Sequence, residues 1–115
     1  MKDKPASSDC VLRPVYFDFD SSTIRTGGRD KLVENAECIR KKNFSKLDVT
    51  GYCDPRGTEE YNLALGDRRA RSTKEYLESL GVQANIHPLS MGEEMARGTD
   101  EKSWSKDRRV EFRVQ

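Results

Sequence analysis

Long apolar runs are missing from this sequence. Its longest uninterrupted stretches of apolar residues have two or three members, whereas a helix that spans a bilayer needs about 20, and nothing resembles the apolar core of a signal peptide. An excess of one charge is missing too, because 21 Lys and Arg residues balance 20 Asp and Glu residues. This balance argues against a domain built to coat nucleic-acid phosphates. With a single histidine, His87, and no C-x-x-C pair among the three cysteines, a zinc site is not expected.

The length indicates one folded domain with a small core. A chain of 115 residues falls within the usual size of a single domain. Apolar side chains make up 34% of it and charged side chains 36%, which predicts a heavily charged surface. The net charge of +1 argues against disorder, since disordered chains combine low hydrophobicity with high net charge. Residues 1–10 are polar and contain Pro5, so we expect a flexible linker or cloning remnant there and the folded domain over residues 11–115.

Apolar patterns with strand and helix periods predict the element order β-α-β-α-β-α-β. Strands are expected over residues 15–20, 47–53, 84–90 and 110–114, and helices over residues 30–42, 58–80 and 99–104. Because helices between strands require crossover connections, the pattern predicts a two-layer α+β or α/β fold, with a four-stranded mixed sheet and helices packed on it. In the first strand Val15, Phe17 and Phe19 share the buried face. Cys38 falls off the apolar stripe of its helix and is expected outside the core, whereas Trp104 is expected to pack into it.

One arginine lies where an apolar residue is expected. On a helical wheel at about 100° per residue, Arg69 falls between Leu65 and Leu80 on the apolar arc of its helix. A guanidinium aimed at the core needs a carboxylate partner or an anionic ligand, because an unpaired buried charge costs several kcal/mol. Asp54 is the obvious complement, since it follows a strand and opens the Pro/Gly turn that leads into the same helix. The two residues could form a structural salt bridge, the arginine stem could lie along the core with its head in water, or the pair could bind a ligand.

Four segments, in order along the chain, carry a resemblance to one family. The first is V-Y-F-D-F-D-S-S-T-I, Val15 to Ile24, and the second is G-Y-C-D-P-R-G-T-E-E-Y-N-L-A-L-G-D-R-R-A, Gly51 to Ala70. The second matches the pattern Gly-x-x-Asp-x-x-Gly-x-x-x-x-Asn-x-x-Leu-x-x-x-Arg-Ala. S-M-G-E-E, from Ser90, and W-S-K-D-R-R-V-E-F, from Trp104, complete the set. Together they resemble the OmpA-like peptidoglycan-binding domain, and within that family the peptidoglycan-associated lipoproteins most closely.

The resemblance implies non-covalent binding of the peptide stem of peptidoglycan through its meso-diaminopimelate residue. Asp54 and Arg69 match the family's two ligand-binding positions. A free amino-acid centre presents an ammonium and a carboxylate together, so Asp54 would meet the ammonium and Arg69 would hold the carboxylate with its two-pronged donor geometry. Secondary ligand contacts are expected from residues that match other pocket positions of the family, namely Phe19, Asp20, Arg56, Thr58, Asn62 and Leu65.

Four of these secondary positions have structural alternatives. Phe19 and Leu65 could equally be core residues, because both lie on faces expected to be buried. Thr58 could serve only as the N-cap of its helix, and Asn62 could only brace the preceding turn.

The resemblance also implies a binding module without catalysis, metal or cofactor. It places the domain on the periplasmic face of the outer membrane, in a lipid-anchored parent whose anchor lies upstream of this chain. There it would tether the membrane to the cell wall, with TolB and other Tol proteins as partners and no nucleic acid. In the periplasm Cys10 and Cys38 could form a disulfide.

Other functions are weighed against this one. The same domain could belong to a porin or to a flagellar stator protein. A periplasmic hydrolase of cell-wall peptides would need a nucleophile, a metal or an acid–base pair in the pocket, and the sequence indicates none. An RNA-binding domain is disfavoured by the balanced charge and by the lack of aromatic residues clustered on basic strands.

Overall fold

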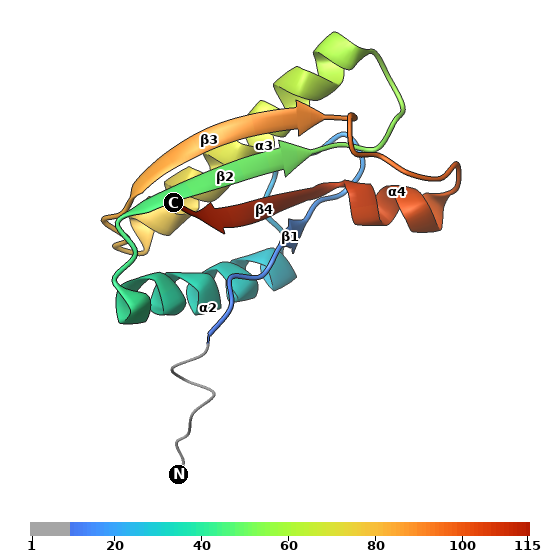
Figure 1. Ribbon diagram of the computed structural model, residues 1–115. Helices are drawn as coiled ribbons and strands as arrows, with labels where there is room; N and C mark the ends of the chain where they lie inside the picture. Colours follow the sequence, from blue (N-terminus) through green and yellow to red (C-terminus); the bar gives the residue numbers. More distant parts are fainter. Residues whose placement is uncertain (1–9) are drawn as a thin grey trace.

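The structure, a computed structural model, describes residues 10–115 (Figure 1), so almost all of the expected linker lies outside the described residues. Four strands form one sheet in the order β1-β4-β2-β3. They are β1 (Val15–Tyr16), β2 (Lys46–Tyr52), β3 (Asn85–Gly92) and β4 (Arg109–Val114). β2 and β3 run parallel, whereas β4 runs antiparallel to both β1 and β2. The predicted four-stranded mixed sheet is confirmed.

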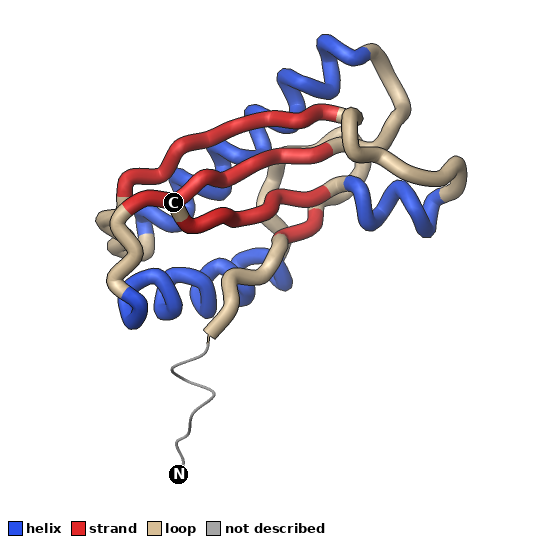
Figure 2. The backbone as a smooth tube through the Cα atoms, viewed as in Figure 1, coloured by secondary structure: helices blue, strands red, loops and turns tan. Residues whose placement is uncertain are grey.

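The helices are α2 (Thr26–Lys42), α3 (Glu59–Ser79) and α4 (Glu101–Asp107). α2 and α3 pack against one face of the sheet, while α4 lies beyond its end, next to the start of β4 (Figure 2). The core between the two layers takes residues from all four strands and from α2 and α3, among them Val15, Leu32, Ala36, Leu47, Val49, Leu77, Ile86 and Val110. The two-layer arrangement is thereby confirmed. Among the described residues, none of the helices combines the length and apolar character that crossing a bilayer requires.

The segment before β1 is tied to α2. The backbone N–H and C=O of Arg13 both bond the Asn35 carboxamide, at 2.9 Å each. One turn further along the helix Cys38 forms a disulfide with Cys10, as considered from the sequence. The expectation that Cys38 lies outside the core is wrong: it is buried, because the chain segment that carries its disulfide partner covers that side of the helix.

The first strand is shorter than predicted, and this changes the position of Phe19. β1 ends at Tyr16, and Asp20 adopts a positive φ of 53°, so the chain turns away from the sheet. Phe17 remains buried, but Phe19 is 56% exposed, which corrects the prediction that it shares the buried face. Trp104 is half-buried and therefore only partly fulfils its expected core role.

β2 and α3 approach each other closely at two glycines. A Cβ atom added to Gly51 would lie 1.9 Å from the carbonyl oxygen of Gly66, a distance that no side chain can occupy. This crossing brings the next turn of α3, which carries Arg69, against the end of β2. The site described below depends on that approach.

Candidate functional site

A pocket of about 430 Å³ lies between the end of β2 and the first turns of α3. Its lining includes all eight residues that the sequence analysis selected: Phe19, Asp20, Asp54, Arg56, Thr58, Asn62, Leu65 and Arg69. Cys53, Gly57 and Tyr61 complete the wall. Residues from three separate segments of the chain therefore meet at one end of the sheet.

The turn that leads from β2 into α3 is fixed by its own polar groups. Gly57 has a φ of 96°, a conformation that favours glycine. The Thr58 hydroxyl caps α3 by accepting from the N–H of Tyr61 at 3.0 Å. Asn62 donates from its carboxamide to the carbonyl oxygen of Arg56 at 2.9 Å. Thr58 and Asn62 thus hold the turn as their structural interpretations predict, and both also line the pocket.

Arg69 is buried, with 1% of its surface exposed. Its Nε donates to the Ser21 carbonyl at 2.8 Å, its Nη1 to the Tyr52 carbonyl at 2.9 Å and its Nη2 to the Asp18 carbonyl at 3.0 Å. A further contact joins Nη1 to the Cys53 sulfur at 3.6 Å. A guanidinium has five N–H donors, so one on Nη2 has no acceptor among residues 10–115. Burial lowers the pKa of Arg69, yet an arginine stays charged at any physiological pH.

The structure decides between the alternatives for Arg69. Its head is buried, so the interpretation with the head in water is wrong. In residues 10–115 no carboxylate lies within 4.0 Å of its nitrogens, so a direct salt bridge with Asp54 is wrong too. The guanidinium is held by three backbone carbonyl oxygens and the Cys53 sulfur, beside a pocket that Asp54 also lines.

The Asp54 carboxylate is buried and paired with two other arginines. Its Oδ1 accepts from the backbone N–H of Arg56 at 3.1 Å and from Arg56 Nε at 3.2 Å. Its Oδ2 accepts from Arg56 Nη2 at 2.9 Å and from Arg108 Nη1 at 3.4 Å. Burial by itself raises the pKa of Asp54, but the hydrogen bonds from Arg56 and Arg108 outweigh it and hold the pKa below its ordinary value.

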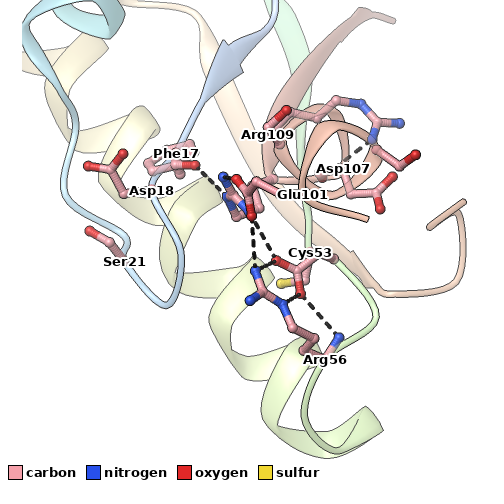
Figure 3. Close-up of polar contacts among 12 residues, drawn as sticks. Phe17, Asp18, Ser21, Cys53, Arg56, Glu101, Asp107 and Arg109 are labelled. Carbon is pink, nitrogen blue, oxygen red and sulfur yellow. Dashed lines mark hydrogen bonds and ion pairs between the residues drawn. The ribbon is translucent and has the colours of Figure 1, made fainter. Parts of the chain in front are cut away.

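The sequence analysis missed two members of this network, Arg108 and Glu101. Arg108 is buried and donates to the Phe17 carbonyl at 3.0 Å and to Glu101 at 2.9 Å. Figure 3 shows Glu101, from α4, and Arg56, from the turn, converging near the end of β2. Burial lowers the pKa of Arg108, but its pairs with Glu101 and Asp54 raise it further than burial lowers it. The only signal in the sequence was the place of Arg108 within the last segment of the resemblance, since neither residue interrupts an apolar pattern.

Aromatic rings cover the outer side of the network. The Arg56 guanidinium carbon lies 3.9 Å from the centre of the Phe19 ring and 4.1 Å from that of the Trp104 ring. Such contacts are typical of cation–π attraction. The Tyr61 hydroxyl donates to the Asp20 carboxylate, which joins the first turn of α3 to the loop after β1.

Cys53 is the free thiol at the base of the pocket. Its sulfur donates to the Asn62 carbonyl at 3.2 Å, and burial raises its pKa to about 11. The thiol is therefore protonated at neutral pH, and a protonated thiol is a poor nucleophile. Within residues 10–115 no cluster of three or more His, Cys, Asp or Glu residues could hold a metal ion.

A family model described as "OmpA family" matches residues 16–111. This chain belongs to the OmpA family. It is 40% identical over 117 residues to a peptidoglycan-associated lipoprotein of Pseudomonas putida, an alignment that covers 96% of this chain and 70% of the relative. A protein of the same name from Brucella melitensis is 39% identical over 99 residues, covering 84% of this chain and 59% of that protein.

Solved structures agree with this assignment. A crystal structure of the peptidoglycan-associated lipoprotein from Burkholderia pseudomallei superposes with a TM-score of 0.82 at 39% identity, covering 90% of each chain. The C-terminal domain of Helicobacter pylori MotB has a TM-score of 0.81 at 21% identity, covering 91% of this chain and 85% of that one. The second likeness shows a shared fold alone. The predicted family is confirmed, as is its closeness to the peptidoglycan-associated lipoproteins.

Proposed function

We propose that this protein binds peptidoglycan without covalent attachment, and that the diaminopimelate residue of the peptide stem enters the pocket between β2 and α3. The observation that carries the proposal is the buried Arg69 guanidinium, which has no carboxylate of residues 10–115 within 4.0 Å. A buried cation without a direct ion pair, beside a pocket, favours an anionic ligand group. The names of the relatives, which describe peptidoglycan-associated lipoproteins, support the same ligand.

The pocket supplies a group for each charge of an amino-acid centre. The ligand carboxylate would accept from the remaining N–H of Arg69, and the ammonium would lie against Asp54. Phe19 and Leu65 would contact the methylene chain between the two centres of diaminopimelate. Asp20, Arg56, Thr58 and Asn62, which all line the pocket, would supply further polar contacts.

The cellular setting is part of the proposal. We place the domain on the periplasmic face of the outer membrane, in a lipid-anchored parent protein that ties this membrane to the cell wall. TolB and other Tol proteins are proposed partners. The relatives at about 40% identity are lipoproteins by name, whereas the likeness to MotB is limited to 21% identity, so a stator protein or a porin is less well supported.

A cell-wall peptide hydrolase is the candidate from a different class. It would need a nucleophile or an activated water in the pocket. The pocket thiol, Cys53, is protonated and bonded to a backbone carbonyl, and Asp54 is occupied by two arginines. These features favour binding over hydrolysis.

Co-sedimentation with purified peptidoglycan tests the proposal. We expect Asp54→Asn, which keeps the shape and removes the charge, to lose most of the bound fraction at a temperature where circular dichroism shows it to be folded. Asp67→Asn is the matched control, because Asp67 lies on the outer face of α3 and pairs with Arg71. An Asp54→Asn variant that sediments as the wild type does would overturn the proposal.

A further inference from the structure

The carboxylate of Asp54 already carries as many hydrogen bonds as it can accept. A carboxylate has about four acceptor positions on its two oxygens. At Asp54 three are taken by Arg56, from its backbone N–H, its Nε and its Nη2, and one by Arg108. A ligand ammonium can therefore reach Asp54 only by replacing one of these donors.

Arg56 is the donor that can be replaced. Its side chain is 34% exposed, whereas that of Arg108 is 8% exposed and is also held by the Phe17 carbonyl. The backbone of Arg56 is fixed independently, since its N–H bonds Asp54 and its carbonyl accepts from Asn62. The guanidinium can thus leave Asp54 without opening the turn.

A second carboxylate lies next to this guanidinium. Glu101 is 3.8 Å from Arg56 Nη2 and its side chain is 66% exposed. An exposed ion pair of this kind contributes about 1 kcal/mol or less, so it cannot replace the two-pronged, ring-covered pair with Asp54. A displaced Arg56 therefore needs a further anion close by.

We propose that Arg56 determines the charge specificity of the pocket by occupying Asp54 until a ligand brings both an ammonium and a carboxylate. The ammonium takes over the Asp54 oxygens, and the ligand carboxylate, which accepts from Arg69, also accepts from the released Arg56 guanidinium, beside Glu101. An amine without a carboxylate must also displace Arg56 from Asp54, but it supplies no anion to pair with the released guanidinium. This inference rests on the proposed function and makes it more specific. The pocket selects a zwitterionic centre through direct contacts and also because the Arg56 guanidinium competes with the ligand for Asp54.

Two probes with the same carbon chain between their amino groups test the competition by Arg56. They are meso-diaminopimelate and 1,5-diaminopentane, which lacks both carboxylates. With isothermal titration calorimetry, we expect the wild type to prefer diaminopimelate by at least about tenfold, equivalent to about 1.4 kcal/mol. In Arg56→Gln and in Arg56→Lys we expect the diamine to bind more tightly than in the wild type, so that the preference falls by at least about threefold.

The Arg56→Lys variant distinguishes the effect of the two-pronged pair with Asp54 from the effect of the positive charge alone. Lys keeps the positive charge but lacks the two-pronged donor geometry, so a change in Arg56→Gln alone would mean that only net charge matters and would overturn the inference. Arg71→Gln removes a charge from the outer face of α3 and should leave both affinities unchanged. If both Arg56 variants weaken the two probes equally, Arg56 is a direct ligand contact and the competitor role is wrong.

Co-sedimentation of the wild type with peptidoglycan, run in parallel, distinguishes the two proposals. A wild type that neither sediments with peptidoglycan nor binds diaminopimelate overturns the proposed function itself. A wild type that binds both, with an unchanged preference in the Arg56 variants, overturns only the role given to Arg56.

Discussion

Helix α3 passes through two regions in which burial has different consequences. Its second half places Leu77 in the apolar core, with Leu47 of β2 opposite in the same cluster. Its first half buries Asn62 and Arg69 beside the pocket. Burying a leucine side chain stabilises a fold by about 1.5–3 kcal/mol, whereas a hydrogen-bonded polar group contributes about 0.5–1.5 kcal/mol net.

The comparison indicates that the two regions are built for different purposes. The apolar core supplies stability, and its side chains are interchangeable within limits of volume. The pocket region supplies geometry, because each buried charge is held in place by two or more partners. A substitution in the first region should change stability without changing binding by the folded protein, whereas one in the second should reduce binding and also cost a smaller amount of stability.

The largest effect on stability is expected in the apolar core. Leu47→Ala should lower the free energy of unfolding by about 2–5 kcal/mol, since a fully buried leucine leaves a cavity. Leu89→Ala, in the neighbouring strand but 39% exposed, is the matched control and should lose less than about 1 kcal/mol. Urea denaturation measures both. Equal losses at the two positions would contradict the assignment of the core to one face of the sheet.

A smaller and pH-dependent effect is expected at the pocket. Asp54→Asn should lose about 1.5–3 kcal/mol at pH 7, because the Arg56 and Arg108 bonds are to a charged group. Burial raises the pKa of Asp54, but its arginine partners lower it below the ordinary value, which is about 3.9 in an unfolded chain. This stabilisation is present above the unfolded pKa and is lost as the pH falls through the folded pKa. Urea denaturation should show that the difference in free energy of unfolding between Asp54→Asn and the wild type becomes smaller below about pH 4. A constant or growing difference would be evidence against the charged pair.

The smallest effect is a gain in stability at the end of α4. Asp107 is buried, its Oδ1 accepts from the Arg97 backbone N–H at 3.3 Å, and its Oδ2 has no partner among the described residues. Burial and, to a smaller degree, the Asp54 charge raise the pKa of Asp107, and the Arg97 hydrogen bond and the charges of Arg109 and Arg108 offset this only in part. Asp107→Asn removes the buried charge and should raise stability at pH 7 by about 0.5–1 kcal/mol.

The pH dependence of this gain has the opposite sign to that of Asp54. A raised folded pKa means that the wild type is stabilised below the unfolded pKa and loses this stability as the pH rises through the folded pKa. The advantage of Asp107→Asn should therefore disappear in acid, where both residues are neutral. Thermal unfolding followed at pH 3 and pH 7 checks this, and an advantage that persists at pH 3 would rule out relief of charge as its cause.

Local patterns in the sequence were sufficient for the element order and for the main members of the site. The alternation of apolar and polar residues predicted β2 and β4, and the helical wheel identified Arg69 as a charged residue on an apolar face. Both signals depend on the spacing of residues that are close in the sequence. The same patterns failed at Phe19 and Cys38. The exposure of Phe19 depends on the turn at Asp20, and the burial of Cys38 depends on a residue 28 positions away.

What the sequence determined by itself is the fold class, the family and the presence of one cation and one anion near the same turn. Only the tertiary structure decided how those charges are used. In the folded protein Arg69 and Asp54 are not paired, and Asp54 accepts hydrogen bonds from Arg56 and Arg108 instead. Glu101, from α4, accepts a hydrogen bond from Arg108. The physical reason is that ion pairs are set by distance in space, and the contact between Arg108 and Asp54 joins residues 54 positions apart, a separation over which no local pattern carries information.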